Sequence, residues 1–381
     1  MKRFLKVLKI IGIAILSIVV LILLFIGIYS QIGNSKIEAT IDGLGTKLIV
    51  LSYSSLDGEN SHFKFAYCIN DKIKLRATLN NTCEASIRVI ENPTTFRSKR
   101  IGFFMEPLGE TKLKGKLNGI SIDYDIIAGN KLSYQFAELR KELLPFYEEE
   151  SRLWLKNKQL RETDREKSKR ITEQFDSLRF YTVAPKRTEF AKRHLDYELS
   201  PSYFLESHVP KDTVIKYTNL LSQNVKNSPY GVILSAMVSG WKNTENGSIA
   251  PEFSQTTLDG KNFNLKQFRG KYLVLDFWGS WCGPCMYGVP KMREYYNKYK
   301  TQVEFVGIAC NDTESDWKKA IVSNQMNWNQ ILNDKSSMDI SVLYGISSYP
   351  TKIVINQKGE IINKFSGEGE SFYHAVDSIM K

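Results

Sequence analysis

Two cysteines near the end of the chain, Cys282 and Cys285, constrain the fold more than any other feature. The segment before them, residues 271–277, is short and mostly apolar, as in a strand buried within an α/β sheet. The segment after them, residues 284–300, has the spacing of a helix, with Pro290 as an expected kink. We therefore predict a strand–turn–helix unit whose first helical turn holds both sulfur atoms, close enough to form a small disulfide.

The position of Cys282 at the start of the predicted helix favours a reactive sulfur. Unpaired backbone N–H groups and the helix dipole stabilise a thiolate there and lower its pKa below the value of a free cysteine. We expect Cys282 to be the nucleophile. Cys285, one turn further into the helix, is the expected resolving thiol, and the pair is the expected redox-active disulfide.

Metal binding is the main alternative, because a Cys-x-x-Cys pair also occurs in zinc sites. A four-sulfur zinc site requires a second pair with similar spacing. The remaining cysteines, Cys68, Cys83 and Cys310, stand alone, and the four histidines form no paired ligand pattern. The sequence therefore predicts a redox dithiol that uses no metal and no other cofactor.

The rest of this region alternates between strand and helix patterns. We predict a strand at 303–309, a helix at 314–324, a hairpin made by 351–355 and 361–365, and a final helix at 370–380. A turn-rich segment at 250–270 precedes the central strand. The pattern predicts an α/β domain over residues 244–381.

This stretch, from residue 248 to residue 381, resembles the thioredoxin superfamily and, within it, the membrane-anchored TlpA/ResA-like thiol–disulfide oxidoreductases. The Trp-Cys-Gly-Pro-Cys motif, the lead-in at 250–270 and the loop at 347–351 carry the resemblance. It implies a thioredoxin-like fold and a cis peptide bond before Pro350 that faces the dithiol, with an ordinary trans turn as the alternative. It also implies a substrate-binding surface made of Trp281, Gly283, Pro284, Tyr349 and Pro350.

Two further positions are interpreted through this resemblance. Asp276 matches the buried aspartate of thioredoxins, which implies that it accepts the proton of Cys285; a partly solvated aspartate at the strand end is the alternative. Gly288 stands where many TlpA/ResA-like proteins carry a glutamate, three residues after the second cysteine. The resemblance therefore does not extend to the family's specific role in cytochrome c maturation.

The N-terminal end predicts attachment to a membrane. Residues 10–29 form an almost unbroken apolar run, and about 20 apolar residues suffice to cross a bilayer. Four basic residues within positions 1–9 place that end in the cytoplasm, so we expect a single-pass anchor in the cytoplasmic (inner) membrane with the bulk of the chain in the periplasm or extracytoplasmic space. A cleaved signal peptide is the alternative, but no Ala-x-Ala pattern follows the run.

Two more regions separate the anchor from the α/β domain. Residues 35–130 contain short alternating stretches broken by glycines, which predict an antiparallel β-sandwich. This part weakly resembles an all-β domain of unknown function found in Bacteroidetes relatives. Residues 131–243 predict a helical domain. Cys68 and Cys83 form either a structural disulfide or two small buried residues, and Cys310 is expected to be a buried, inert thiol.

The formal net charge of +11 is spread along the chain, without a glycine-rich phosphate loop, a zinc finger or an RNA-binding aromatic signature, so we expect no nucleic-acid partner. The expected partners are disulfide-containing client proteins and an upstream membrane dithiol donor.

Three functions remain open. The first is a disulfide reductase or isomerase, because a Gly-Pro pair between the cysteines is the thioredoxin type, with a potential of about −270 mV in thioredoxin itself. The second is a thiol peroxidase, which usually requires a lone activated cysteine with threonine and arginine nearby. The third is a cell-envelope binding protein with an accessory redox domain.

Overall fold

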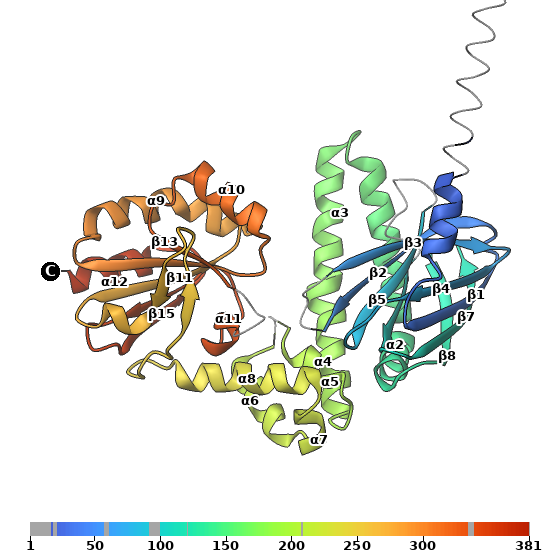
Figure 1. Cartoon of the computed structure of the whole chain (residues 1–381), viewed down its shortest axis with the longest axis horizontal. Coiled ribbons are helices and arrows are strands. Elements are labelled where there is room, and N and C mark those ends of the chain that lie inside the picture. The colour runs from blue at the N-terminus through green and yellow to red at the C-terminus, as the bar shows by residue number, and fades with distance from the viewer. Residues whose placement is uncertain are drawn as a thin grey trace, which may run out of the picture. The chain divides into compact units, whose positions relative to one another are not determined.

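The structure, a computed structural model, describes residues 17, 21–56, 61–90, 100–119, 121–206, 209–333 and 339–380 (Figure 1). The chain divides into two compact units, the first ending at Tyr203 and the second beginning at Phe204. This division falls inside the stretch 131–243, for which the sequence predicts one helical domain. The helices of that stretch are therefore shared between the two units, and the assignment of a separate helical domain stays a prediction.

The first unit contains one eight-stranded sheet with the strand order β6-β5-β2-β3-β4-β1-β7-β8. Its strands are β1 (Ser35–Asp42), β2 (Lys47–Ser55), β3 (His62–Ile69), β4 (Lys72–Ala77), β5 (Cys83–Ile90), β6 (Arg100–Met105), β7 (Glu110–Asn118) and β8 (Ser121–Ala128). The prediction of an antiparallel β-sandwich is therefore wrong in two respects. The strands share one sheet, and β1 runs parallel to β7. Alternating hydrophobicity tells which side chains face the core but not which strands pair.

The sheet curls so that one face covers a single core. Buried side chains from all eight strands belong to the same apolar cluster. The two edge strands also meet, because the Tyr124 hydroxyl on β8 donates to the carbonyl oxygen of Gly102 on β6 and accepts from its N–H, at 2.7 and 2.8 Å. A curled sheet buries its own apolar face without a second sheet.

Cys68 and Cys83 do not form a disulfide, and both are buried. They lie on β3 and β5, which pair with opposite edges of β2. Cys68 stands opposite Lys47, and Cys83 stands opposite Ser55. Eight residues of strand correspond to roughly 26 Å, whereas a disulfide requires Cα atoms less than about 7 Å apart. The disulfide that the sequence left open is excluded, and burial raises the pKa of the Cys68 thiol to about 11.

Helix α2 (Lys131–Leu160) packs against β6 and β8 of this sheet. It is followed by α3 (Arg165–Leu178), the π-helix η1 (Arg179–Val183) and α4 (Ala184–Arg193), which contact α2, and α5 (Ser200–Phe204) crosses the division. The Ser133 hydroxyl ties α2 to β6 through the backbone N–H and C=O of Phe104, both at 2.9 Å. Asp164 caps α3 through the backbone N–H of Lys167, so α2 and α3 form a hairpin of two helices.

The second unit begins with helices α6 (Lys211–Leu220), α7 (Gln223–Lys226) and α8 (Pro229–Asn243). A small hairpin follows, made of β9 (Ser254–Thr256) and β10 (Asn262–Asn264), and then the short helix η2 (Leu265–Phe268). The main elements are β11 (Tyr272–Trp278), α9 (Gly283–Tyr299), β12 (Val303–Ala309), α10 (Glu314–Asn324), β13 (Asn329–Leu332), α11 (Ile340–Leu343), β14 (Thr351–Ile355), β15 (Ile361–Ser366) and α12 (Glu370–Ile379). The predicted strands and helices of this region are confirmed, whereas β13 and α11 were not predicted.

These strands form a five-stranded sheet in the order β13-β12-β11-β14-β15. The central strand β11 runs parallel to β12 and antiparallel to β14. Its side chains alternate between two apolar clusters. Val274 and Trp278 face the cluster that contains α9, α10 and α12, while Leu275 and Phe277 face the opposite cluster. Apolar side chains therefore cover both faces of the sheet, and the dithiol lies at the end of its central strand, as expected for a thioredoxin-like fold.

Helix α8 is fixed against the α/β domain by a close contact with α11. The Trp241 indole donates to the carbonyl oxygen of Gly345 at 2.7 Å, and the Thr244 hydroxyl donates to that of Tyr344 at 3.2 Å. Gly240 makes this approach possible, because a Cβ atom there would lie 2.3 Å from the carbonyl oxygen of Val342. The segment after α8 thus starts from an anchored helix.

We expect Gly240→Ala to destabilise the second unit by about 1–2 kcal/mol, because an overpacked backbone contact outweighs the gain in helix propensity. Urea unfolding followed by tryptophan fluorescence measures this, since five of the six tryptophans follow Tyr203. Ser239→Ala on the exposed side of the same helix is the control. If Gly240→Ala is as stable as the wild type or more stable, helices α8 and α11 can move apart without loss of stability.

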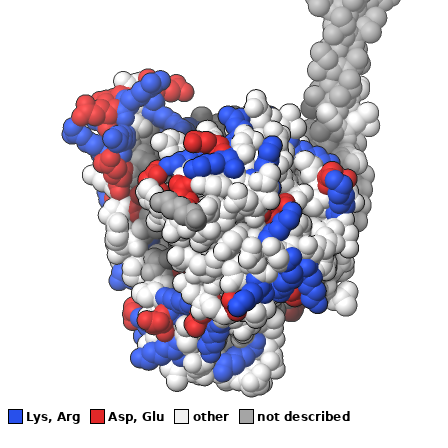
Figure 2. All heavy atoms as spheres, turned by 90° about the vertical axis from the view of Figure 1, so that its left-hand side faces the viewer, with Lys and Arg blue, Asp and Glu red and all other residues white. Residues whose placement is uncertain are grey.

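Charged side chains of both signs are mixed over the face shown in Figure 2, where Lys and Arg stand among Asp and Glu. In the second unit, ion pairs such as Lys298–Asp377 at 2.9 Å and Lys318–Glu314 at 2.6 Å are partly exposed. Exposed pairs of this kind contribute little to stability. The excess positive charge is therefore not gathered into one large patch on this face.

Half of the predicted membrane anchor, residues 10–29, lies outside the described residues, which include Ser17 and 21–29 of it. Residues 21–29 are helical and apolar, and Leu21, Phe25 and Ile28 are 65–68% exposed. Within the described part of the chain, none of the helices combines the length and the apolar character needed to span a bilayer.

Candidate active site

Cys282 and Cys285 are joined by a disulfide at the N-terminus of α9, with their Cα atoms 5.2 Å apart. Cys282 is the N-cap residue, and its Sγ accepts a hydrogen bond from the backbone N–H of Cys285 at 3.2 Å. Both residues are buried, with 4% and 5% of their surface exposed. This is the arrangement in which helix N–H groups can stabilise a thiolate at Cys282 once the disulfide is reduced.

The loop before the disulfide is held from the end of β12. The indole of Trp281 donates to the carbonyl oxygen of Cys310 at 3.1 Å. The Asp312 carboxylate accepts from the backbone N–H and the hydroxyl of Ser280, at 2.6 and 2.7 Å. These contacts orient the loop at the helix start, and they give the buried Cys310 a structural position rather than a place among the reacting atoms.

The peptide bond between Tyr349 and Pro350 is cis. The Tyr349 ring meets the Trp281 ring edge to face, with centroids 5.4 Å apart, and it packs against the apolar cluster that includes both cysteines. The loop that carries Pro350 therefore lies beside the disulfide, as the resemblance implied. Because proline has no N–H, this loop leaves room for the backbone of a bound segment.

The surface around the buried disulfide is partly apolar. Trp281, Gly283 and Pro284 are exposed on one side of it, and Trp281 is 54% exposed. Tyr287, one turn into α9, is 84% exposed and was not singled out from the sequence. Exposed aromatic residues around a reactive centre suit the docking of an unfolded or flexible polypeptide.

Asp276 lies beneath the dithiol on β11. Strand alternation puts its side chain on the same face as Val274 and Trp278, which is the face covered by α9. Only 8% of Asp276 is exposed, and its Oδ1 atom has no hydrogen-bond partner among the described residues. Burial raises the pKa of the Asp276 carboxyl, Lys352 lowers it in part, and Glu368 raises it further.

Three residues near Asp276 were not predicted from the sequence to belong to the site. Lys352 stands directly opposite Asp276 on β14, with its Nζ 3.8 Å from Oδ1 and 2.6 Å from the carboxylate of Glu368. The Tyr373 hydroxyl donates to the same carboxylate at 2.7 Å. A lysine within the otherwise mostly apolar strand Thr351–Ile355 was the available signal, because a buried lysine requires a partner. Nothing local pointed to Glu368 or Tyr373.

Comparisons with known proteins show what this chain is similar to. Residues 246–364 match the model of the AhpC/TSA family. Thiol-disulfide oxidoreductase ResA of Bacillus thuringiensis subsp. konkukian is 36% identical over 125 residues, which are 32% of this chain and 71% of that protein. ResA of Bacillus subtilis is 30% identical over 152 residues, covering 39% of this chain and 83% of that protein.

This chain belongs to the thioredoxin-like thiol–disulfide oxidoreductases. Among solved structures, the thioredoxin domain of a thiol-disulfide oxidoreductase from Bacteroides vulgatus is 32% identical, covers 36% of this chain and 99% of that chain, and has a TM-score of 0.34. The part of the oxidoreductase that matches the family model, residues 246–364, lies in its second unit.

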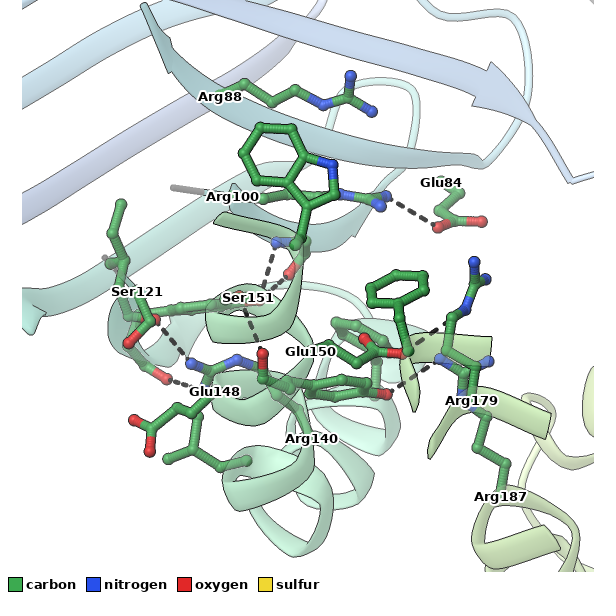
Figure 3. Close-up of a pocket in the computed structure, with 18 residues that line it drawn as sticks. Glu84, Arg88, Arg100, Ser121, Arg140, Glu148, Glu150, Ser151, Arg179 and Arg187 are labelled. Carbon is green, nitrogen blue, oxygen red and sulfur yellow. Dashed lines mark hydrogen bonds and ion pairs between the residues drawn. The ribbon is translucent and has the colours of Figure 1, made fainter. Parts of the chain in front are cut away.

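The first unit of the oxidoreductase holds a separate pocket of about 510 Å³ (Figure 3). Five arginines line it together with aromatic side chains such as Trp154; they are Arg88, Arg100, Arg140, Arg179 and Arg187. Arg140 is buried, stacks on the Tyr124 ring at 3.8 Å and donates to carbonyl oxygens of β8. Arg100 lies 3.6 Å from Glu84, and Arg179 lies 3.5 Å from Glu150.

Arg100, Arg140 and Arg179 are therefore already paired with carboxylates or backbone carbonyl oxygens of the protein itself. In the part of the chain that the structure describes, no three His, Cys, Asp or Glu side chains gather into a group that could hold a metal ion.

Proposed function

We propose that this thiol–disulfide oxidoreductase is a membrane-anchored, extracytoplasmic enzyme that reduces or isomerises disulfides in client proteins. The single observation that carries the proposal is the Cys282–Cys285 pair at the N-terminus of α9, beside the cis Tyr349–Pro350 bond. The helix N-terminus activates one sulfur, and the proline loop leaves a surface on which a client backbone can lie.

The reaction has two exchange steps. The Cys282 thiolate attacks one sulfur of a client disulfide, a mixed disulfide forms, and the other client sulfur leaves as a thiolate that takes up a proton. Cys285 then loses its proton and attacks the Cys282 sulfur, which forms the Cys282–Cys285 disulfide and releases the reduced client. Two electrons pass from the dithiol to the client, so an upstream membrane dithiol donor must reduce the enzyme again.

Asp276 is the proposed acceptor of the Cys285 proton. Cys285 is buried on the first turn of α9, where the described structure exposes only 5% of it, so bulk water is a poor base for it. Asp276 lies on the strand face beneath that helix, and its raised pKa makes it a better proton acceptor than an ordinary aspartate.

Three features support the proposed location. Residues 21–29 form an apolar helix most of whose side chains are exposed on the protein, which suits contact of this segment with a lipid phase. Four basic residues within positions 1–9 favour a cytoplasmic N-terminus. Outside the cytoplasm, disulfides form readily, so client proteins with incorrect disulfides would occur there.

A parallel assay tests the activity. The reduced protein should reduce insulin disulfides in the presence of a small dithiol and should show little turnover of hydrogen peroxide. Peroxide turnover without insulin reduction would establish the peroxidase alternative instead. Replacing Cys285 by Ala in cells should trap clients on Cys282 as mixed disulfides, and mass spectrometry of the trapped species identifies them.

The pocket in the first unit favours one other candidate, a binding protein whose redox domain is accessory. Replacing both Cys282 and Cys285 by Ser in the full chain separates the two functions. A reductase loses its cellular function in this variant, whereas a binding protein keeps it.

A further inference from the structure

The space above Gly288 is filled by a carboxylate from a distant part of the chain. Gly288 lies three residues after Cys285 on α9, and a Cβ atom there would stand 2.4 Å from the carboxylate of Glu368. Glu368 lies between β15 and α12, eighty residues later in the sequence. The carboxylate of Glu368 thus occupies the space that the missing side chain of Gly288 leaves on α9.

Glu368 is held in this place by two short contacts. The Lys352 ammonium donates to its Oε2 at 2.6 Å, and the Tyr373 hydroxyl donates to its Oε1 at 2.7 Å. The side chains of Lys352 and Glu368 are only 4% and 13% exposed. Buried charges of this kind persist only when they are paired and hydrogen-bonded.

The buried carboxyl groups of Glu368 and Asp276 differ in their hydrogen-bond partners. Lys352 is the cation shared by Glu368 and Asp276, but it lies 2.6 Å from Glu368 and 3.8 Å from Asp276, too far for a hydrogen bond to the latter. The Asp276 Oδ1 atom is left without a partner among the described residues. Glu368 is therefore the acid that is paired with the ammonium at hydrogen-bonding distance, and Asp276 is the acid with an unpartnered oxygen.

We propose that Glu368 is a positioning residue for disulfide exchange: by holding the Lys352 ammonium, it leaves Asp276 free to exchange a proton with Cys285 and sets the pH range of that step. This inference rests on the proposed function. The charged groups that act on Asp276 are Lys352 from β14 and Glu368 from the segment before α12, and Asp276 in turn acts on Tyr373 of α12. Cys285 belongs to α9, the helix that covers the same face of the sheet. Lys291 of α9 lies over the Tyr373 ring at 4.6 Å.

The test is the variant Glu368→Gln in the full chain. The amide keeps the shape but cannot hold the ammonium as an ion, so Lys352 turns to Asp276 and lowers its proton affinity. In the profile of rate against pH for the Cys285 step, we expect the acid limb, where the rate rises with pH, to move to lower pH by about one unit or more. The probe is an aromatic disulfide whose thiolates absorb visible light; in a stopped-flow experiment, Cys282 releases the first thiolate and Cys285 the second.

Matched variants identify the cause of a shift. Glu370→Gln changes an exposed carboxylate of α12, paired with Lys291, and should leave the profile in place. Asp276→Asn should remove the limb. Gly288→Ala should displace the Glu368 carboxylate without deleting it and move the limb in the same direction as Glu368→Gln, which covers the case in which that variant does not fold.

An acid limb that stays in place in Glu368→Gln overturns the inference while leaving the reductase proposal intact. The converse failure is also distinguishable, because the Asp276 carboxyl can be titrated directly by carbon NMR. If the wild-type protein does not reduce any disulfide, the proposed function fails, but a lower titration midpoint of Asp276 in Glu368→Gln still supports the role of Glu368.

Discussion

Replacement of Cys282 by Ser should abolish insulin reduction, with a loss of roughly a thousandfold or more, as expected when the attacking nucleophile is removed. A serine hydroxyl is not ionised at neutral pH and cannot form a mixed disulfide. Cys282 is buried and caps α9, and serine is a favourable N-cap residue of similar size, so the fold should be retained. Insulin precipitation in the presence of a small dithiol measures the rate.

The partner variant Cys285→Ser provides the control for this prediction. It keeps the attacking sulfur, so a mixed disulfide with insulin should accumulate and be detected by mass spectrometry, although turnover is slow. Equal rates of insulin reduction by the wild type and by Cys282→Ser would show that another thiol performs the reduction. The three other cysteines, Cys68, Cys83 and Cys310, are all buried, which makes that result unexpected.

Replacement of Lys352 by Met should destabilise the second unit by about 3–5 kcal/mol, the usual loss when one partner of a buried ion pair is removed. Lys352 is the cation that lies between the buried carboxyls of Asp276 and Glu368. Methionine fills similar space but leaves both acids without a counter-ion. Urea unfolding of the full chain measures the loss, with Lys358→Met, an exposed lysine of the following turn, as the control.

The loss should depend on pH in a defined direction. The pKa of Asp276 is raised in the folded protein, so its contribution to stability is fully present below the unfolded value of about 3.9 and is lost as pH rises through the folded value. Without Lys352 this raised pKa moves higher still. The difference between Lys352→Met and wild type should therefore be larger at neutral pH than near pH 4. If the free energies of unfolding of Lys352→Met and the wild type differ by less than about 1 kcal/mol at neutral pH, the ion pairs of Lys352 add nothing to stability.

The C-terminal domain was the part most open to sequence reasoning, because its signals are local. An apolar strand, a Cys-x-x-Cys pair and a helical segment follow one another directly, and the strand–turn–helix unit was predicted close to its observed bounds, β11 and α9. Strand β13 was missed because only four residues form it, too few for a periodic pattern.

The β-rich unit was predicted less well, because its arrangement depends on contacts between distant segments. The alternating pattern correctly indicated a β-rich region within residues 35–130. It could not indicate that one sheet curls until the Tyr124 hydroxyl of β8 reaches the backbone of β6. It also could not indicate that β2 separates Cys68 from Cys83, which excludes their disulfide.

The amino-acid sequence alone determined the chemistry of this protein: two sulfur atoms on the first turn of a helix, with an aspartate on the strand before it. Those features depend on neighbours in the chain, and the same short stretch places them in any compatible fold. Only the tertiary structure decided the surroundings of the aspartate. Lys352 reaches Asp276 across a strand pairing, and Glu368 enters the space left by Gly288. Electrostatic interactions act through space, and residues that are far apart in a sequence come together only when the sheet and its helices have formed.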